Sequence, residues 1–337
     1  MASNLLKIHT KTIRTPNPAT PFSLSKTLSF TSLPFPTHHQ HSQISLPSTL
    51  VNKSKIPTLS LLCSLSSPTP PNSKEAAIQQ AKTCLTTTLE KPLNNLRLTN
   101  KLKKLKQPRF RIEIPVADDS PESLSQLALQ VFGDLPIKRK GSPVNILVLW
   151  PDITFTKAAL KAFESRPSSP VQHFDISSIA NGNTRILSDA DVAVFLAPEG
   201  SQLAVMKTVV DLLYPRPVVI FNPKWGFEEE AEFGELSSFV GSFEVIFSFM
   251  GLEVKGLLSK RNGVIFKCVR DGVVSGEKWA VLVEEEQGEL KLVSTFKSRP
   301  SIAEVEYVLY NLMAMNSPVT KSVKFFRDLV SNVTGKK

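Results

Sequence analysis

The stretch VNILVLW at residues 144–150 is a nearly unbroken apolar run, and it decides the fold class. Two similar runs follow it, DVAVFLA at 191–197 and PVVIF at 217–221. Helical patterns at 154–163 and 201–214 lie between the runs. Strands that are apolar on both faces and alternate with helices are typical of a parallel sheet covered on both sides. The sequence therefore predicts an α/β fold with a central, mostly parallel, Rossmann-like sheet and helices on both faces.

Other strand patterns lie outward from this centre. Residues 171–174 predict a strand that inserts between the central ones. Residues 109–114 alternate polar and apolar side chains, as a strand with one solvent-facing side does. Toward the C-terminus, turn-separated strand patterns predict antiparallel hairpins, at 243–249, 264–269, 279–285 and 290–296. Further helices are predicted at 73–89, at 120–132, from 301 and from 317 onward.

The N-terminal segment has a composition of its own. No acidic residue precedes Glu75, whereas seven basic residues do, and Ser, Thr and Pro are abundant. This composition builds no packed core and is typical of an organelle transit peptide. The segment lacks the compact apolar run of a secretory signal, and its single arginine, Arg14, favours a chloroplast over a mitochondrial presequence. We expect residues 1–65 to be a disordered chloroplast transit peptide, 66–107 an N-terminal helix and basic connector, and 108–335 a single α/β domain.

The remaining chain is close to charge balance. From Glu75 onward it holds 33 basic and 30 acidic residues, whereas a dedicated nucleic-acid binder keeps a strongly basic domain. A nucleic-acid partner is therefore not expected. No apolar stretch reaches the ~18 residues of a transmembrane helix, so no span is predicted. Cys63, Cys84 and Cys268 have neither disulfide-type nor metal-ligand spacing and are interpreted as ordinary thiols.

Polar side chains follow the central strands. Because the carboxyl ends of parallel strands share one edge, where open α/β sheets bind ligands, this edge is the best candidate site. Its residues are Asp152, Glu199, Ser201, Asn222 and Lys224. A small-molecule or nucleotide-binding enzyme would use them for its ligand. The alternative is that these residues stop strands and cap helices.

Known catalytic and cofactor signatures are missing from the sequence. Neither a G-x-G-x-x-G nor a G-x-x-x-x-G-K-[ST] motif occurs, so no nucleotide cofactor is expected. Four of the five histidines lie in the predicted transit peptide, which leaves His173 alone in the domain. A metal site with two histidines is thereby excluded, and His173, in an apolar strand pattern, is interpreted as structural. We assign no metal site and no catalytic residue.

A basic segment at 97–111 could contact anions. Its candidate residues are Lys101, Lys103, Lys104, Lys106 and Arg109. They could bind lipid headgroups of the thylakoid surface, RNA phosphates or an acidic protein face. The alternatives are a solvated connector, or pairing within the fold with the glutamates at 228–235. The last helix, from 317, has an apolar stripe that suits either a membrane surface or packing on the sheet.

An ordered series of short motifs carries a family resemblance. The motifs are Pro121 to Leu124, Val148 to Asp152, Asp191 to Pro198, Pro217 to Pro223, Trp279, and Arg299 to Ser301. In this order the chain resembles a plastid and cyanobacterial domain-of-unknown-function family, found in the Low Photosystem II Accumulation proteins and as the tail of a chloroplast adenylate kinase. The resemblance implies a protein of the stroma or thylakoid surface that helps photosystem II assemble. It implies chloroplast partners, such as photosystem II subunits or their assembly factors, no cofactor and no established enzymatic activity.

Overall fold

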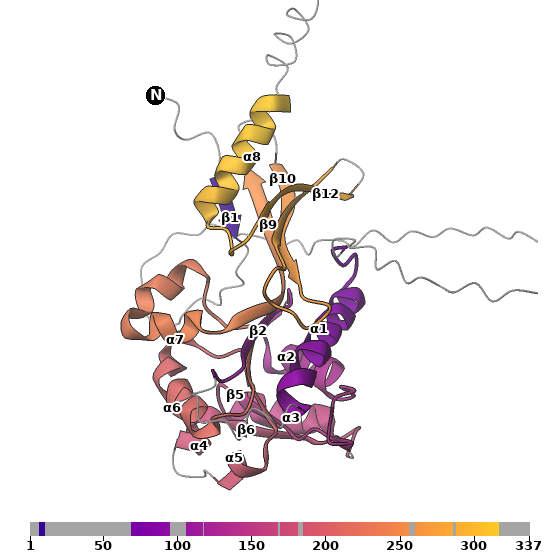
Figure 1. The fold of residues 1–337 in the computed structure, drawn as a ribbon, viewed down its shortest axis with the longest axis vertical. Coiled ribbons are helices and arrows are strands. Elements are labelled where there is room, and N and C mark those ends of the chain that lie inside the picture. Colours follow the sequence, from indigo (N-terminus) through magenta and orange to yellow (C-terminus); the bar gives the residue numbers. More distant parts are fainter. Residues whose placement is uncertain are drawn as a thin grey trace, which may run out of the picture.

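The structure is a computed structural model with one mixed sheet and helices on both of its faces (Figure 1). It describes residues 7–10, 69–94, 106–116, 118–167, 169–180, 185–255, 260–285 and 288–316. Within these ranges the sheet has ten strands, in the order β12-β11-β10-β9-β2-β8-β7-β5-β6, with β1 beside β9. The predicted α/β fold with a mostly parallel centre and antiparallel C-terminal strands is confirmed.

The parallel part of the sheet runs from β9 to β6. Its strands are β9 (Glu244–Lys255), β2 (Arg109–Glu113), β8 (Val218–Phe221), β7 (Val192–Leu196), β5 (Ile146–Trp150) and β6 (Val171–Asp175). Every residue of β5, β7 and β8 is buried, which explains why these strands are apolar on both sides. A two-residue hairpin, β3 (Lys138–Arg139) with β4 (Ser142–Pro143), lies apart from this sheet.

Two expectations about strand position are wrong. Residues 171–174 form β6 at the outer edge beside β5 and do not insert between the central strands. The chain leaves β5 over one face and returns to β7 over the other, and such crossovers extend a sheet in opposite directions. Residues 109–113 form β2 in the middle of the sheet, where the side expected to face solvent is covered by the segment after β8 and Arg111 is 3% exposed.

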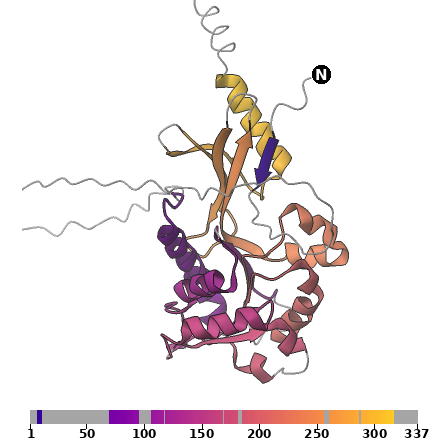
Figure 2. The ribbon, with the colours of Figure 1, turned by 180° about the vertical axis from the view of Figure 1, so that it is seen from behind.

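The helices cover the two faces of the parallel sheet in two groups. On one face lie α1 (Lys74–Asn94), α2 (Pro121–Phe132) and α3 (Ile153–Phe163), which bury their apolar sides against the sheet. The other face is covered by α4 (Ile176–Ala180), α5 (Arg185–Asp189), α6 (Leu203–Leu213) and α7 (Ser237–Gly241). The 3-10 segments η2 (Gly200–Gln202) and η3 (Glu228–Leu236) precede α6 and α7. Figure 2 shows α1, α2 and α3 together on one side of the molecule and α6 and α7 on the other.

The C-terminal strands extend the same sheet in antiparallel fashion. They are β10 (Lys260–Cys268), β11 (Trp279–Glu284) and β12 (Leu290–Phe296), followed by α8 (Ile302–Asn316). The predicted capping box opens α8, since Ser301 Oγ accepts from Glu304 N at 3.3 Å and Ser301 N donates to Glu304 Oε2 at 2.8 Å. The long strand β9 pairs in parallel with β2 and antiparallel with β10, so it belongs to both parts of the sheet.

Few residues of the predicted transit peptide are described. Lys7–Thr10 form β1, which pairs antiparallel with 252–255 at the far end of β9. The rest of 1–68, the connector at 95–105 and the expected last helix at 317 and beyond lie outside the described residues. Among the helices that are described, none is long and apolar enough to cross a membrane.

Candidate functional site

Asp152 has a structural role at the predicted strand-end edge. It directly precedes α3, and its Oδ1 accepts hydrogen bonds from Thr154 N at 2.7 Å and Phe155 N at 3.3 Å. An N-cap aspartate satisfies backbone donors that the first helical turn leaves without partners. The carboxylate is therefore engaged in starting a helix.

Three of the other edge residues also contact the protein itself. Asn222 has φ 47° at the end of β8, and its side chain bonds both the N–H and the C=O of Ile114, at 2.7 and 2.9 Å. Glu199 Oε1 and Lys224 Nζ form an ion pair at 3.3 Å. Ser201 is exposed in η2. The structure brings Glu199 and Lys224 together, but none of the five predicted residues lines either of the two cavities described below.

The predicted anion-contact residues are only partly described. Lys101, Lys103 and Lys104 lie outside the described residues. Lys106 is exposed and pairs with Glu244 at 3.4 Å. Arg109 is half-buried, donates to Ser242 Oγ at 3.0 Å and lies over the rings of Phe239 and Phe243. Lys106 and Arg109 therefore both make contacts within the protein itself.

Charged side chains of β2 form a buried network that the sequence analysis missed. Along β2 the apolar side chains face α1 to α3, and Arg111 and Glu113 face the opposite side, toward η3 and α7. Arg111 pairs with Glu113 at 2.8 Å and also with Glu230 of η3. The alternative that glutamates at 228–235 pair with the basic segment is therefore confirmed for Arg111.

Arg299 completes this network from the loop before α8. Its Nη1 donates to Glu113 Oε1 at 3.0 Å, and Ser248 Oγ donates to Glu113 Oε2 at 2.6 Å. Burial alone would raise the pKa of Glu113, but the positive charges of Arg299 and Arg111 outweigh burial and hold this pKa at about 2. Glu113 is therefore ionised at any pH at which the protein works.

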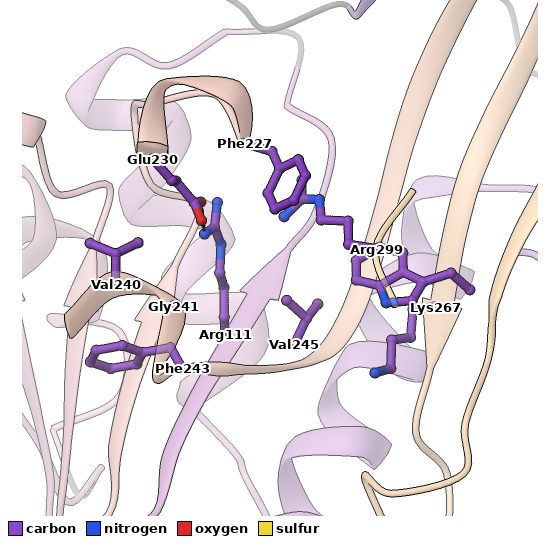
Figure 3. A pocket seen from close by; sticks show the side chains of 10 residues that line it. Arg111, Phe227, Glu230, Val240, Gly241, Phe243, Val245, Lys267 and Arg299 are labelled. Atoms are coloured by element: carbon purple, nitrogen blue, oxygen red, sulfur yellow. Dashed lines mark hydrogen bonds and ion pairs between the residues drawn. The ribbon is translucent and has the colours of Figure 1, made fainter. Parts of the chain in front are cut away.

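A cavity of about 180 Å³ adjoins the network at the junction of the parallel and antiparallel strands (Figure 3). It is called the charged cavity below, and its lining residues are Arg111, Phe227, Glu230, Val240, Gly241, Phe243, Val245, Lys267, Trp279 and Arg299. Strand register explains why distant residues meet here: β9 places Val245 beside Arg111, and Ser248 lies between Glu113 of β2 and Lys267 of β10.

Aromatic rings lie against the cations of the charged cavity. The Arg299 guanidinium lies 4.5 Å from the ring centre of Phe227 and 5.3 Å from that of Trp279. Lys267 Nζ lies 5.5 Å from the Trp279 ring. Figure 3 shows Phe227 over Arg299 on one side and Arg111 beside Glu230 on the other. Cations over ring faces are stabilised by the ring quadrupole, which helps to retain them in a buried place.

Two cysteines lie side by side in the core, which the sequence did not indicate. Cys84 of α1 and Cys268 of β10 are buried with their Sγ atoms 3.5 Å apart, although 184 positions separate them in the chain. The hydrogen bond from Cys84 and the nearby Arg270 lower the pKa of Cys268. A second cavity, of about 230 Å³, is lined by Cys268 and Arg270 together with residues of α1. Sequence spacing gives no signal for such a pair because the contact arises from the packing of α1 on the sheet.

His173 lies in the core, as its interpretation as a structural residue requires. Trp150 Nε1 donates to His173 Nδ1 at 3.2 Å, while His173 Nε2 has no hydrogen-bond partner among the described residues. Burial lowers the pKa of His173 to about 4, so the ring is neutral near pH 7. Within the described ranges, no group of three or more His, Cys, Asp or Glu side chains could hold a metal ion.

Fold and cavity together define a mixed α/β protein whose buried charges gather where its parallel strands meet an antiparallel extension. The chain belongs to the family of the domain of unknown function DUF1995, whose model matches residues 71–307. No curated protein matches the chain. Among solved structures, it is similar to the crystal structure of the flagellar accessory protein FlaH from Methanocaldococcus jannaschii, at 11% identity and a TM-score of 0.24, over 55% of this chain and 90% of that one. That likeness is too low to inform function.

Proposed function

We propose that the chain is a non-enzymatic auxiliary protein of the chloroplast stroma or thylakoid surface that helps photosystem II subunits assemble or accumulate. The observation that carries the non-enzymatic part is the use of the strand-end residues in the fold itself. Asp152 caps α3, Asn222 joins the ends of β8 and β2, and Glu199 pairs with Lys224. In open α/β sheets that bind a ligand, the ligand lies at this edge, whereas here these side chains contact the protein itself.

Two sequence features favour the chloroplast part of this proposal. The acid-free, hydroxyl-rich leader has the composition of a plastid address. The motifs that resemble the Low Photosystem II Accumulation proteins all lie inside the range matched by the family model, 71–307. Chloroplast proteins, with photosystem II subunits or their assembly factors first among them, are therefore the partners we propose.

A plant that lacks this protein tests the proposal. We expect less photosystem II on native gels and lower photochemical efficiency, with unchanged transcripts for the photosystem II subunits. Re-expression of the full chain should restore the complex, whereas a chain without residues 1–65 should not, because it lacks the predicted import signal. Normal photosystem II levels in the mutant, or rescue by the leaderless chain, would refute the proposal.

Affinity purification from separate stromal and thylakoid fractions then identifies the partner. We expect photosystem II subunits or their assembly proteins to be recovered with the tagged full chain. A bait with Lys106→Glu tests whether the exposed Lys106 of the basic segment contributes, and contacts that depend on it should weaken with added salt.

A further inference from the structure

One of the three cations of the charged cavity makes no direct ion pair within the described residues. Arg111, Arg299 and Lys267 are the cations, and Glu113 and Glu230 are the carboxylates that pair with the two arginines. Lys267 is therefore left over. It is 7% exposed, and within the described residues its ammonium has neither a hydrogen bond nor an ion pair, only the ring of Trp279 at 5.5 Å.

A largely buried lysine that makes no direct ion pair loses part of the hydration of its ammonium. Burial accordingly lowers the pKa of Lys267, and the attraction of Glu244 and Glu277 offsets only part of this shift. The Nε–H groups of Arg111 and Arg299 are also buried without acceptors among the described residues. These two groups are too buried for a ligand to reach, so Lys267 is the lining donor that remains for one.

The rest of the lining is apolar and aromatic. Val240, Phe243 and Val245 line the cavity with the rings of Phe227 and Trp279. A volume of about 180 Å³ is close to the ~150 Å³ of a cavity that accommodates benzene. Its occupant is therefore small, with one compact apolar group and an acceptor for the Lys267 ammonium.

We propose that the charged cavity binds a small monocarboxylic acid with a compact apolar group, its carboxylate held by Lys267 and its apolar part against Val245 and Trp279. A carboxylate supplies one anionic acceptor for the ammonium that has no direct ion pair, whereas inorganic phosphate has no apolar group to contact the rest of the lining. This site goes beyond the auxiliary role proposed above, and its failure would leave that role untouched.

Calorimetry and thermal shift on the full chain test the site with three probes of graded chemistry. Benzoate supplies the carboxylate and the ring, benzamide has the same shape without the charge, and inorganic phosphate has charge without an apolar group. We expect saturable binding of benzoate that raises the melting temperature, with at least about tenfold weaker binding of benzamide and of phosphate. Tighter binding of phosphate would overturn the assignment, as would the absence of benzoate binding up to about 10 mM, a very weak affinity.

Two variants locate the binding. Lys267→Met keeps a side chain of similar length but removes the ammonium, so benzoate affinity should fall at least about tenfold. The same variant without ligand should melt at a higher temperature, because it no longer has a largely buried lysine that makes no direct ion pair. Lys278→Met, at the exposed lysine next to Trp279, is the matched control and should bind as the unaltered chain does.

A second route covers the case in which Lys267→Met does not fold. Val245→Phe adds an aromatic ring to the cavity wall and should abolish benzoate binding by occupying the space. Unchanged benzoate binding in either Lys267→Met or Val245→Phe would show that the ligand binds elsewhere and would overturn the proposal.

Discussion

At the scale of single residues, Arg299 makes several buried contacts that no sequence pattern indicates. It donates to Glu113, lies against Phe227 and Trp279, and its Nη2 lies 2.9 Å from the sulfur of Met250. The side chain is 7% exposed. A buried arginine of this kind stabilises the carboxylate that it faces, and its removal leaves that carboxylate with fewer partners.

We expect Arg299→Met to lower the free energy of unfolding by about 3 kcal/mol, because Glu113 keeps only Arg111 and Ser248 as partners in a place shielded from water. Urea denaturation followed by circular dichroism measures this loss. Lys291→Met is the control, since Lys291 and Glu285 form an ion pair exposed to solvent that contributes less than about 1 kcal/mol. Equal losses in the two variants would contradict the buried network.

The second residue-scale prediction concerns pH. His173 has a folded-state pKa of about 4, below its ordinary value of 6.5. As pH falls below about 6.5 the unfolded chain takes up a proton there, whereas the folded protein does so only near pH 4. The contribution of His173 is therefore complete above pH 6.5 and is lost progressively between pH 6.5 and 4.

We expect this residue to account for about 2 kcal/mol of stability lost between pH 7 and pH 5. Unfolding free energies of the unaltered chain and of His173→Phe, measured across this range, test the expectation. The variant loses the hydrogen bond from Trp150 and is less stable at pH 7, but its stability should depend less on pH. Parallel pH profiles for the two proteins would mean that His173 titrates normally.

At the scale of elements, the first turn of α3 depends on Asp152, which directly precedes the helix. We expect Asp152→Ala to cost about 1 kcal/mol of stability, because two backbone N–H groups of the first turn lose their acceptor. Asp152→Asn keeps an equivalent N-cap and should change stability by only a few tenths of a kcal/mol. Thermal unfolding of the three proteins distinguishes them, and an equal effect of both substitutions would argue that the charge of Asp152, rather than its capping bond, is what matters.

The element scale also shows what apolar patterning can predict. Strands β5, β7 and β8 were predictable because they are buried on both faces, and burial on both faces leaves an unbroken apolar run. The position of β2 was not, because Arg111 and Glu113 give it the alternation of a half-exposed strand. Glu230 pairs with Arg111, and Arg299 pairs with Glu113. These partners lie far along the chain, so a local sequence pattern cannot indicate them.

At the scale of the whole molecule, each of three hydrophobic clusters contains one tryptophan. Trp150 lies in the cluster under α1 to α3, Trp225 in the cluster under α6 and α7, and Trp279 in the cluster beneath α8. One sheet passes through all three clusters, and β9 joins its two parts. The three clusters should therefore unfold together.

Variants that retain a single tryptophan, with phenylalanine at the other two positions, test this cooperativity. Within each variant we expect the urea transition seen by fluorescence to coincide with that seen by far-ultraviolet circular dichroism. Comparison within one variant removes the differences in stability that the substitutions introduce. An earlier fluorescence transition in the Trp279 variant would instead mean that the antiparallel part unfolds on its own.

The charged cavity could not be predicted from the sequence, for a reason that belongs to this largest scale. Strand-end residues such as Asp152 and Asn222 were identified because parallel topology fixes where strands end. Lys267 and Arg299 were missed because they come from the antiparallel part and from a loop, and their approach to Arg111 depends on how β9 joins the two parts. A lysine within an apolar strand pattern at 264–269 was the one local signal that could have indicated them.

The dispersed lining of the charged cavity also limits how this protein can be shortened. A truncated chain that ends between β9 and β10 keeps Arg111 and Glu230 but lacks Lys267, Trp279 and Arg299. Neither fragment of such a divided chain holds a complete binding surface, and each exposes charges whose counterparts have gone. The shortest segment that contains every lining residue therefore runs from β2 through the loop before α8, which is nearly the entire domain.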